Sequence, residues 1–312
     1  MSIQRSDSSV VTPPTSHPFL ADKLGPRMVL LVIFLCAIWG GLSPALKISL
    51  EGVPPFGAAA FRFLIGLISL LIWGSFKRIR WWRPAVTHRH LLAFGALFVF
   101  QISVFNLGTE LTSSSHSIVF LSTNPLFVAL VAHFLIPNDR LNLRKGCGLM
   151  LAFLGIWVIF AEGAEFHGNH LLGDLLVLLA GFLLGIVMVF SKFLIRHLTA
   201  FEVAVWQMIY GVPAFFLLSF WMEQERSYNI TASVAVALFY QGVIVAAFCF
   251  VAWTGLLRRH SVSQVSAFNF TTPLLGVLLS WALLAEPVSS GFVLGVLLIA
   301  LGIYLVAKGR DD

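Results

Sequence analysis

Two prolines, Pro125 and Pro273, lie near the middle of long apolar segments, and polar side chains crowd the turns around both. Because proline has no N–H, each one leaves open the helical carbonyl four residues earlier, that of Leu121 or Asn269. The polar groups can then bind a small polar solute, or the side chains can satisfy the carbonyls and only shape the helix. The first interpretation makes these residues candidates for a binding cavity: Thr123, Asn124, Pro125, Asn269, Thr271, Thr272 and Pro273.

Two basic residues, Lys47 and Arg62, are the charged residues closest to the interior of apolar segments. Arg62 lies roughly 9 Å inside its segment at 1.5 Å per residue. If the segment crosses a membrane, a charge at that depth is a functional candidate by default. Arg62 either attracts a substrate carboxylate or pairs with Glu51 or Glu110. Lys47 either belongs to a gate or extends its flexible stem to the membrane surface.

Three further titratable residues stand at the ends of apolar segments. Asp139 and Glu286 are expected on opposite faces, where they either act as alternating gates or cap the helices that follow. His116 can carry a proton, because histidine titrates near physiological pH, or it can be structural. No Asp or Glu lies in the middle of an apolar segment, so proton coupling and facilitated diffusion both stay open.

Trp39, Asn106 and Trp253 complete the set of candidate cavity residues. An aromatic ring can stack on a flat or apolar substrate. Most rings in membrane proteins pack between helices or face lipid, however, so the aromatic residues do not identify a substrate.

The sequence lacks the motifs of the main enzyme classes that work in membranes. It has no His-Glu-x-x-His zinc motif, no paired carboxylates in mid-segment and no Gly-rich phosphate loop. Its three cysteines, Cys36, Cys147 and Cys249, show neither metal-ligand spacing nor a disulfide framework. We expect no cofactor and no metal, and an intramembrane enzyme is the least favoured interpretation.

The segments that must position these residues are too apolar for a water-soluble globule. Hydrophobic residues make up 58% of the 312 and charged residues 11%, against roughly 25% charged in soluble domains. We predict an all-α membrane protein with ten transmembrane helices, each near the length that a bilayer core requires. The predicted spans are 28–48, 56–76, 90–109, 115–136, 145–161, 171–191, 202–221, 233–256, 264–284 and 291–307.

The basic residues predict the orientation. Apart from Lys47 and Arg62, every Lys and Arg except Arg226 falls in the two tails or in one set of alternate connections. By the positive-inside rule, both termini are cytoplasmic, and we expect a multi-pass protein of the bacterial cytoplasmic membrane. The basic stretch 77–89 with its tryptophans is then an interfacial loop rather than a nucleic-acid site. Residues 1–26 are rich in Ser, Thr and Pro, which predicts a disordered cytoplasmic tail.

The two halves of the chain match when one is shifted by about 145 residues. Each predicted half holds five spans, an odd number, so the second half must cross the membrane in the opposite sense. Inverted repeats are typical of secondary transporters. We predict a first repeat at 27–162, a second at 163–307 and a short cytoplasmic tail at 308–312. The matches include Gly40 with Gly185, Lys47 with Lys192, Pro125 with Pro273, Gly148 with Gly295 and Gly155 with Gly302.

At these positions the chain resembles the EamA family of the drug/metabolite transporter superfamily, over about residues 28 to 307. The resembling motifs are Trp39-Gly40 followed by Lys47, Arg62-Phe63, Pro125 through Asp139-Arg140-Leu141 to Gly148 and Gly155, and Pro273 through Glu286-Pro287 to Gly295 and Gly302. Asp139 departs from the pattern, since Glu is more usual there. The resemblance implies the ten-helix fold and export of metabolites, but it does not name a substrate.

Repeat and resemblance together predict a secondary transporter that exports small polar metabolites, such as amino acids or their analogues, by alternating access. A flippase for lipids or lipid-linked sugars is the main alternative, and an intramembrane enzyme is an alternative from another class. The expected partners are a small-molecule substrate and the lipid bilayer, without nucleic acid. Monomer and homodimer are both open.

Overall fold

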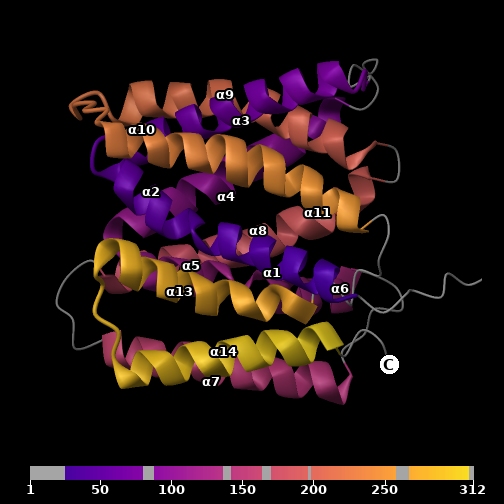
Figure 1. Ribbon diagram of the computed structural model, residues 1–312, viewed down its shortest axis with the longest axis vertical. Helices are drawn as coiled ribbons and strands as arrows, with labels where there is room; N and C mark the ends of the chain where they lie inside the picture. The colour runs from indigo at the N-terminus through magenta and orange to yellow at the C-terminus, as the bar shows by residue number, and fades with distance from the viewer. Residues whose placement is uncertain are drawn as a thin grey trace, which may run out of the picture.

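The computed structural model describes residues 25–79, 88–135, 142–163, 170–195, 198–257 and 267–308, and every regular element in these ranges is helical (Figure 1). In these ranges, nine helices or runs of helices are long and apolar enough to cross a membrane, and Phe268–Leu284 is a shorter apolar tenth. The predicted all-α fold with ten spans is therefore confirmed.

The helices follow one another in two sets of five spans. The first set is α1 (Pro26–Gly40) with α2 (Leu42–Leu50), α3 (Pro55–Phe76), α4 (His88–Leu111), α5 (Ser114–Leu121) with α6 (Asn124–Leu135), and α7 (Leu143–Gly163). The second set is α8 (His170–Leu194), α9 (Ala200–Met222), α10 (Ala232–Phe239) with the π-helix η2 (Tyr240–Cys249) and α11 (Phe250–Leu257), the 3₁₀ turn η3 (Ala267–Phe270) with α13 (Thr271–Leu284), and α14 (Ser290–Lys308).

The first span is interrupted where the sequence predicted a continuous helix, and the fourth is interrupted beside Pro125, where the sequence predicted a disturbed helix. The first breaks at Gly41, between α1 and α2. Next to this break, a Cβ on Gly40 would lie 2.8 Å from the backbone nitrogen of Gly276, so only glycine allows α1 and α13 to approach so closely. The fourth span breaks at Ser122 and Thr123, just before Pro125, because proline cannot continue the helical hydrogen bonds.

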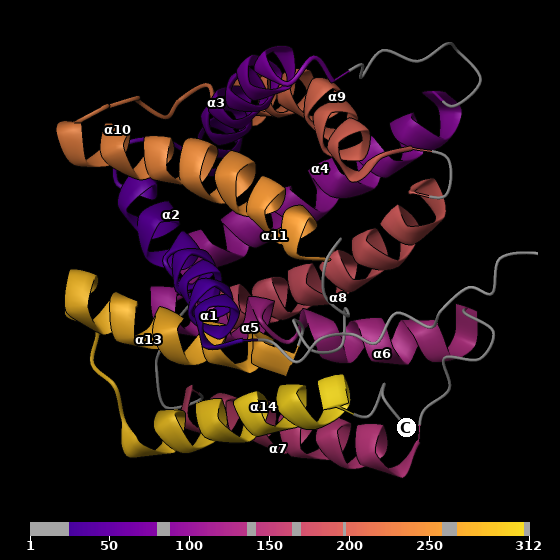
Figure 2. The same cartoon turned by 45° about the vertical axis from the view of Figure 1, so that its right-hand side comes forward.

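The packing of α7 against α14 shows the inverted repeat directly. These two helices lie side by side at one edge of the molecule, while α3 and α9 lie together at the opposite edge (Figures 1 and 2). A Cβ on Gly148 would lie 2.8 Å from the carbonyl oxygen of Gly302, and one on Gly155 would lie 2.6 Å from that of Gly295. Gly148 and Gly155 correspond to Gly295 and Gly302 in the repeat, so a two-fold rotation exchanges the two contacts.

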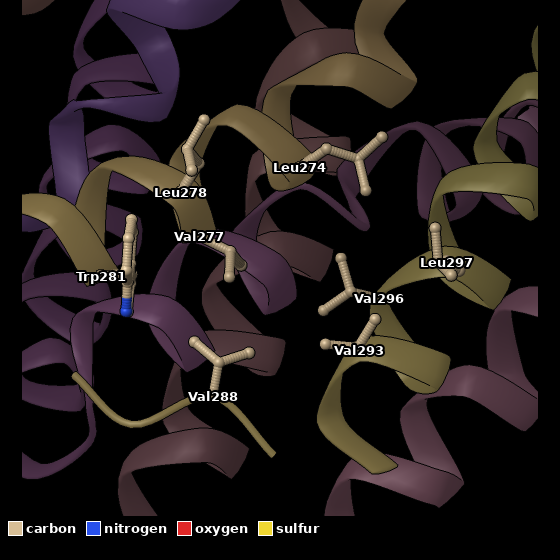
Figure 3. A pocket seen from close by; sticks show the side chains of 8 residues that line it. All are labelled: Leu274, Val277, Leu278, Trp281, Val288, Val293, Val296 and Leu297. Carbon is tan, nitrogen blue, oxygen red and sulfur yellow. The ribbon is translucent and has the colours of Figure 1, made fainter. Parts of the chain in front are cut away.

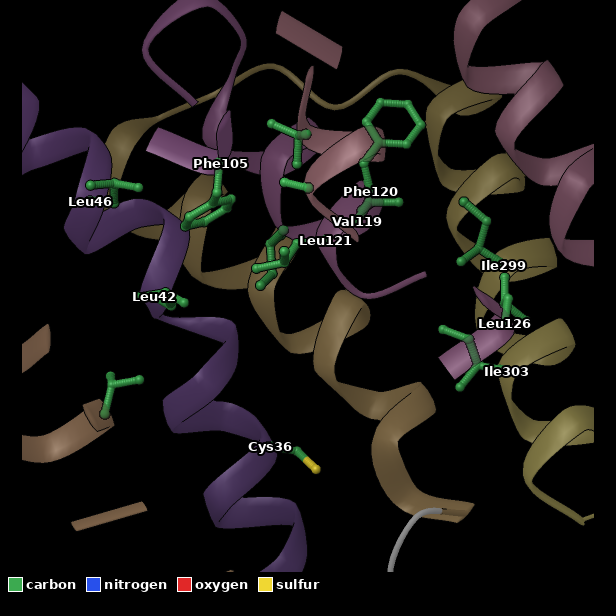
Figure 4. Packing of buried hydrophobic residues seen from close by; sticks show 14 of the residues in the cluster. Cys36, Leu42, Leu46, Phe105, Val119, Phe120, Leu121, Leu126, Ile299 and Ile303 are labelled. Carbon is green, nitrogen blue, oxygen red and sulfur yellow. The ribbon is translucent and has the colours of Figure 1, made fainter. Parts of the chain in front are cut away.

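The core lies between the central helices, and the outer helix faces are apolar as well. Buried side chains of α1, α2, α4, α5 and α14 meet in one cluster, which includes Leu46, Phe105, Phe120 and Ile299 (Figure 4). Large apolar side chains such as Trp157 and Phe220 are exposed on the outside. A soluble protein rarely exposes so much apolar surface, whereas helices in a bilayer do so throughout their span.

Candidate functional site

A central cavity of about 340 Å³ lies between the two halves. In the described part of the chain, every span except the fifth and the tenth lines it, so the α7–α14 pair stands outside the site. Its walls are largely apolar, with a few polar side chains that converge from different helices, which is the usual composition of a small-molecule site. The polar lining residues are Arg62, Gln101, Ser122, Asn124, Gln207, Asn269 and Thr272.

The lining follows the two-fold symmetry of the repeats. Many lining residues of the first half have repeat counterparts that also line the cavity, for example Trp39 with Leu184 and Asn124 with Thr272. Arg62 corresponds to Gln207, so the two halves place a cation and a neutral amide at equivalent positions. The cavity therefore lies on the axis that relates the halves.

Seven of the residues proposed from the sequence line this cavity, and four do not. Those at the cavity are Trp39, Arg62, Asn124, Pro125, Trp253, Asn269 and Thr272. Among the others, Pro273 is buried in α13. The Asn106 amide donates to the Pro55 carbonyl at 2.8 Å, and this hydrogen bond holds α4 against the start of α3. The remaining two, Thr123 and Thr271, are engaged with the helices around the prolines.

The side chains around Pro125 satisfy the carbonyls that the break leaves open. Asn124 Nδ2 donates to the Leu121 carbonyl at 3.1 Å, and Thr123 Oγ1 donates to the Phe120 carbonyl at 2.6 Å. The ninth span repeats this contact, because Thr271 Oγ1 donates to the Phe268 carbonyl at 2.7 Å. Thr123, Asn124 and Thr271 therefore repair the helices, as the structural interpretation predicts, and Asn124 also lines the cavity. Binding of a solute at these turns stays a prediction.

Arg62 is the most unusual residue of the site. It is only 6% exposed, and its guanidinium carbon lies 4.6 Å from the centroid of the Phe63 ring. No group in the described residues accepts a hydrogen bond from its Nε or Nη1. The predicted alternative, an ion pair with Glu51 or Glu110, is not formed there: Glu110 pairs with Arg226 and Glu51 is exposed. Burying an unpaired charge costs several kcal/mol, so a cavity with this arginine favours an anion.

Aromatic rings give the cavity rigid walls. Trp39 and Trp253 meet edge to face, with centroids 4.8 Å apart and planes at 72°. Phe63 and Phe98 make a similar contact at 4.8 Å and 75°. Such pairs are stabilising, and they leave flat apolar surface beside Arg62.

Gln101 and Gln207 line the cavity but escaped the sequence analysis. Gln101 is 2% exposed, and its amide reaches the Ala180 carbonyl only at 3.5 Å. A signal for Gln207 was present in the sequence, since it stands where the repeat places the counterpart of Arg62. A neutral polar residue in mid-span is a functional candidate just as a charged one is.

A second hollow, of about 310 Å³, lies between α13 and α14. Figure 3 shows its eight side chains, among which only the indole N–H of Trp281 is polar. This groove offers almost nothing for a polar solute to bind, so the central cavity is the candidate site.

Comparisons with known proteins agree with this architecture. The sequence profile of the EamA-like transporter family matches residues 26–161 and 171–308, one match in each half. The chain belongs to the EamA-like transporter family. The resemblance noted in the motifs is thereby confirmed, and this family member is a multi-pass membrane protein.

Its relatives are transporters by name. The "Uncharacterized transporter YoaV" of Bacillus subtilis (strain 168) is 26% identical, over 89% of this chain and 96% of the relative. The "Probable amino-acid metabolite efflux pump" of Escherichia coli (strain K12) is 23% identical, over 89% and 94%. A solved crystal structure shares the fold with a TM-score of 0.66 at 20% identity, over 89% of this chain and 96% of that one.

One face of this EamA-like transporter is held together by charged groups at helix ends. Lys47 Nζ donates to the carbonyls of Thr109 at 2.9 Å and Glu110 at 3.0 Å, and also to that of Thr112. These carbonyls end α4, where a positive charge complements the helix dipole. The charge of Lys47 is therefore held by the end of α4.

Glu286 and Glu223 complement the starts of two helices on the same face. The Glu286 carboxylate accepts from the backbone N–H groups of Ser114 at 2.6 Å and Ser115 at 2.8 Å. It thus caps α5, not α14, the helix that follows it. Glu223 accepts from the N–H groups of Phe56 at 2.8 Å and Gly57 at 3.0 Å, at the start of α3. Both contacts join one half to the other.

The half-buried His116 and the buried Asp174 form a pair on this face. His116 Nδ1 lies 2.9 Å from Asp174 Oδ2, and the same carboxylate accepts from Thr112 Oγ1. The His116 ring stacks on Phe292 of α14, with centroids 4.7 Å apart. The pair therefore joins α5 to α8, again across the halves. Asp139, the expected counterpart of Glu286, lies outside the described residues.

We call this face, defined by the contacts above, the closed face. Two further contacts belong to it: the Arg226–Glu110 ion pair, and the Asn229 N–H, which donates to the Gly52 carbonyl at 2.8 Å. The cavity extends away from it. Asp174 is at the closed face, and the cavity-lining Val187 is roughly 20 Å further along α8 at 1.5 Å per residue. Likewise Asn269 precedes α13, while Glu286 follows it.

Proposed function

We propose that this protein is a secondary transporter that exports small polar metabolites by alternating access between its two repeats, residues 27–162 and 163–307. The observation that carries the proposal is the cavity on the two-fold axis, because equivalent positions of both halves line it. Two similar halves can exchange roles, so that the same site faces one side of the membrane and then the other.

The closed face serves as the outer gate in this proposal. The connections on this face contain few Lys and Arg residues. By the positive-inside rule, the face is then on the outer side of the membrane and both termini are cytoplasmic. We also propose that the membrane is the bacterial cytoplasmic membrane, because the relatives from Bacillus subtilis and Escherichia coli are bacterial. The structure then corresponds to a state closed to the outside, and export requires the contacts of Glu223, Glu286 and the His116–Asp174 pair to open.

The name of the Escherichia coli relative supports amino-acid metabolites as the substrates to test first. The size of the cavity, about 340 Å³, is at the small end of the range for ligand sites. It suits a small solute better than a whole lipid, which favours metabolite export over the flippase alternative.

Counterflow into proteoliposomes tests the proposal. The vesicles are loaded with amino acids, N-acylated amino acids, nucleobases or small amines, and tracer uptake is followed with and without a pH gradient. Saturable exchange of one class is expected, and its response to the gradient decides between coupled and facilitated transport.

Vesicles without protein correct for leakage in this assay. Lipid scrambling without exchange of any solute would favour the flippase. Chemical conversion of a solute would favour an enzyme.

A further inference from the structure

We infer that the substrate is an organic monoanion, a carboxylic acid without a free amine, rather than a zwitterionic amino acid or an amine. The inference rests on the proposed function, because it takes the central cavity as the transport site. Three observations carry it: an unpaired cation in the cavity, the position of the carboxylates, and the state of the carbonyls at the helix breaks.

The unpaired cation is Arg62. Its side chain lines the cavity, and the residue is only 6% exposed. Its Nε and Nη1 have no hydrogen-bond acceptor in the described residues. Arginine presents its donors in a planar fork that fits a carboxylate with two parallel hydrogen bonds. A substrate carboxylate would therefore supply what the protein does not.

In the described part of the chain, no carboxylate lines the cavity to receive an ammonium group. Of the Asp and Glu side chains that the structure describes, six belong to the closed face or its loops, and the seventh, Glu202, caps its own helix at Thr199. The six are Glu51, Glu110, Asp174, Glu223, Glu225 and Glu286. A zwitterion would bring a positive charge close to Arg62 with no opposite charge to balance it.

At the helix breaks, side chains already satisfy three of the carbonyls that could otherwise replace the missing carboxylate. Open carbonyls at a helix break can bind a cation. Here the carbonyls of Phe120 and Leu121 already accept from Thr123 and Asn124, and that of Phe268 accepts from Thr271. The polar groups that remain, such as Gln101 and Gln207, are neutral amides, whose N–H groups can also donate to an anion.

A carboxylate fits better than a phosphate monoester. Phosphate monoesters carry more than one negative charge near neutral pH, and Arg62 is the single Lys or Arg that lines the cavity in the described residues. The apolar rings of Trp39, Phe63 and Trp253 would contact the rest of the molecule.

Matched compounds of equal shape and different charge test the inference on the full-length protein. One series is N-acetyl-L-leucine, L-leucine, L-leucine methyl ester and N-acetyl-L-leucinamide, and a second series is built on phenylalanine. Binding is measured as the ligand-dependent rise in Tm of the purified protein, and transport as counterflow of the same compounds.

The N-acetylated acids are expected to bind at least about tenfold more tightly than the other three members of their series. Arg62→Gln should remove this preference, and Arg62→Lys should retain part of it. Arg226→Gln, which changes an arginine outside the cavity, should leave the preference unchanged.

Equal or tighter binding of the amino acids or esters would overturn the inference, while their transport would still support the proposed function. A preference for the acids that survives Arg62→Gln in folded protein would also overturn it. Binding of the acids without counterflow would support the inference about the site and contradict the transport function.

Discussion

The closed face and the central cavity treat charge in opposite ways. At the closed face, the buried or half-buried charged groups have partners: Lys47 at the end of α4, Glu223 and Glu286 at the starts of α3 and α5, and Asp174 with His116. In the cavity, Arg62 leaves two of its nitrogens without a partner in the described residues. The paired charges of Glu223, Glu286 and Asp174 join one half to the other, and the unpaired charge of Arg62 leaves room for a ligand.

This difference predicts which substitutions change the affinity for substrate and which change the stability of the closed face. A change at Arg62 should alter affinity with little effect on the closed face. Changes at the closed face should alter stability and opening with little effect on affinity.

Arg62→Glu should produce the largest change. Reversing the charge puts a carboxylate in a cavity that has no other charged side chain among its described lining residues. Loss of a buried charge partner costs roughly 2–5 kcal/mol. We expect the affinity for anionic substrates to fall by about 100-fold or more, as measured by counterflow and by the rise in Tm with ligand.

Arg226→Glu is the matched control for that substitution, because Arg226 is half-exposed at the closed face. It should leave the affinity within about twofold, since exposed ion pairs contribute little. Equal losses in the two variants would contradict a special role of the unpaired arginine.

Asp174→Asn should destabilise the protein without altering substrate affinity. The substitution removes the charge that holds His116 and Thr112, and hydrogen bonds to charged groups are worth roughly 1.5–3 kcal/mol. The expected result is a lower Tm in the absence of ligand, with an unchanged ligand-dependent shift. Glu51→Gln, at an exposed acid of the same face, is the control and should leave Tm unchanged.

Much of the fold and the buried arginine of the cavity were predictable from the sequence, whereas the contacts of the closed face were not. The apolar segments, the glycine matches and the lone intramembrane arginine were visible because they depend on residue type and spacing. Contacts between the halves were not. His116 and Asp174 lie at the starts of two spans that are distant in the sequence, and only the inverted packing of α5 against α8 brings them together.

The π-helix in the eighth span was likewise beyond sequence analysis. Its residues read as an ordinary apolar helix, and its contacts are tertiary. The Tyr240 hydroxyl donates to the Ile38 carbonyl at 2.6 Å, and Gln241 Nε2 donates to the Ala45 carbonyl at 3.1 Å. These bonds link η2 to the first span near its own break, so they depend on how the spans pack rather than on local propensity.

Glu223→Gln should loosen the closed face by a smaller amount. The amide keeps an acceptor for the start of α3 but loses the charge that favours a helix N-terminus, an effect of about 1 kcal/mol. The amide hydrogens of Phe56 and Gly57 should then exchange about fivefold faster in hydrogen-exchange measurements. Glu225→Gln, an exposed neighbour in the same connection, should leave their exchange unchanged. Unchanged exchange in the Glu223→Gln variant would mean that the Glu223 charge does not stabilise the closed face.

The double substitution Thr123→Val with Thr271→Val should have the smallest effect on substrate binding. Both hydroxyls donate to carbonyls of their own helices and do not line the cavity, so their loss should lower stability by about 1 kcal/mol and leave affinity within about twofold. Asn124→Val, one residue away but facing the cavity, should reduce affinity several-fold more than the double variant. The contrast separates threonines that only repair the helix from Asn124, which repairs it and also lines the cavity. A larger loss of affinity in the threonine variant would place the hydroxyls in the binding site and would shift the recognition site from the arginine toward the proline turns.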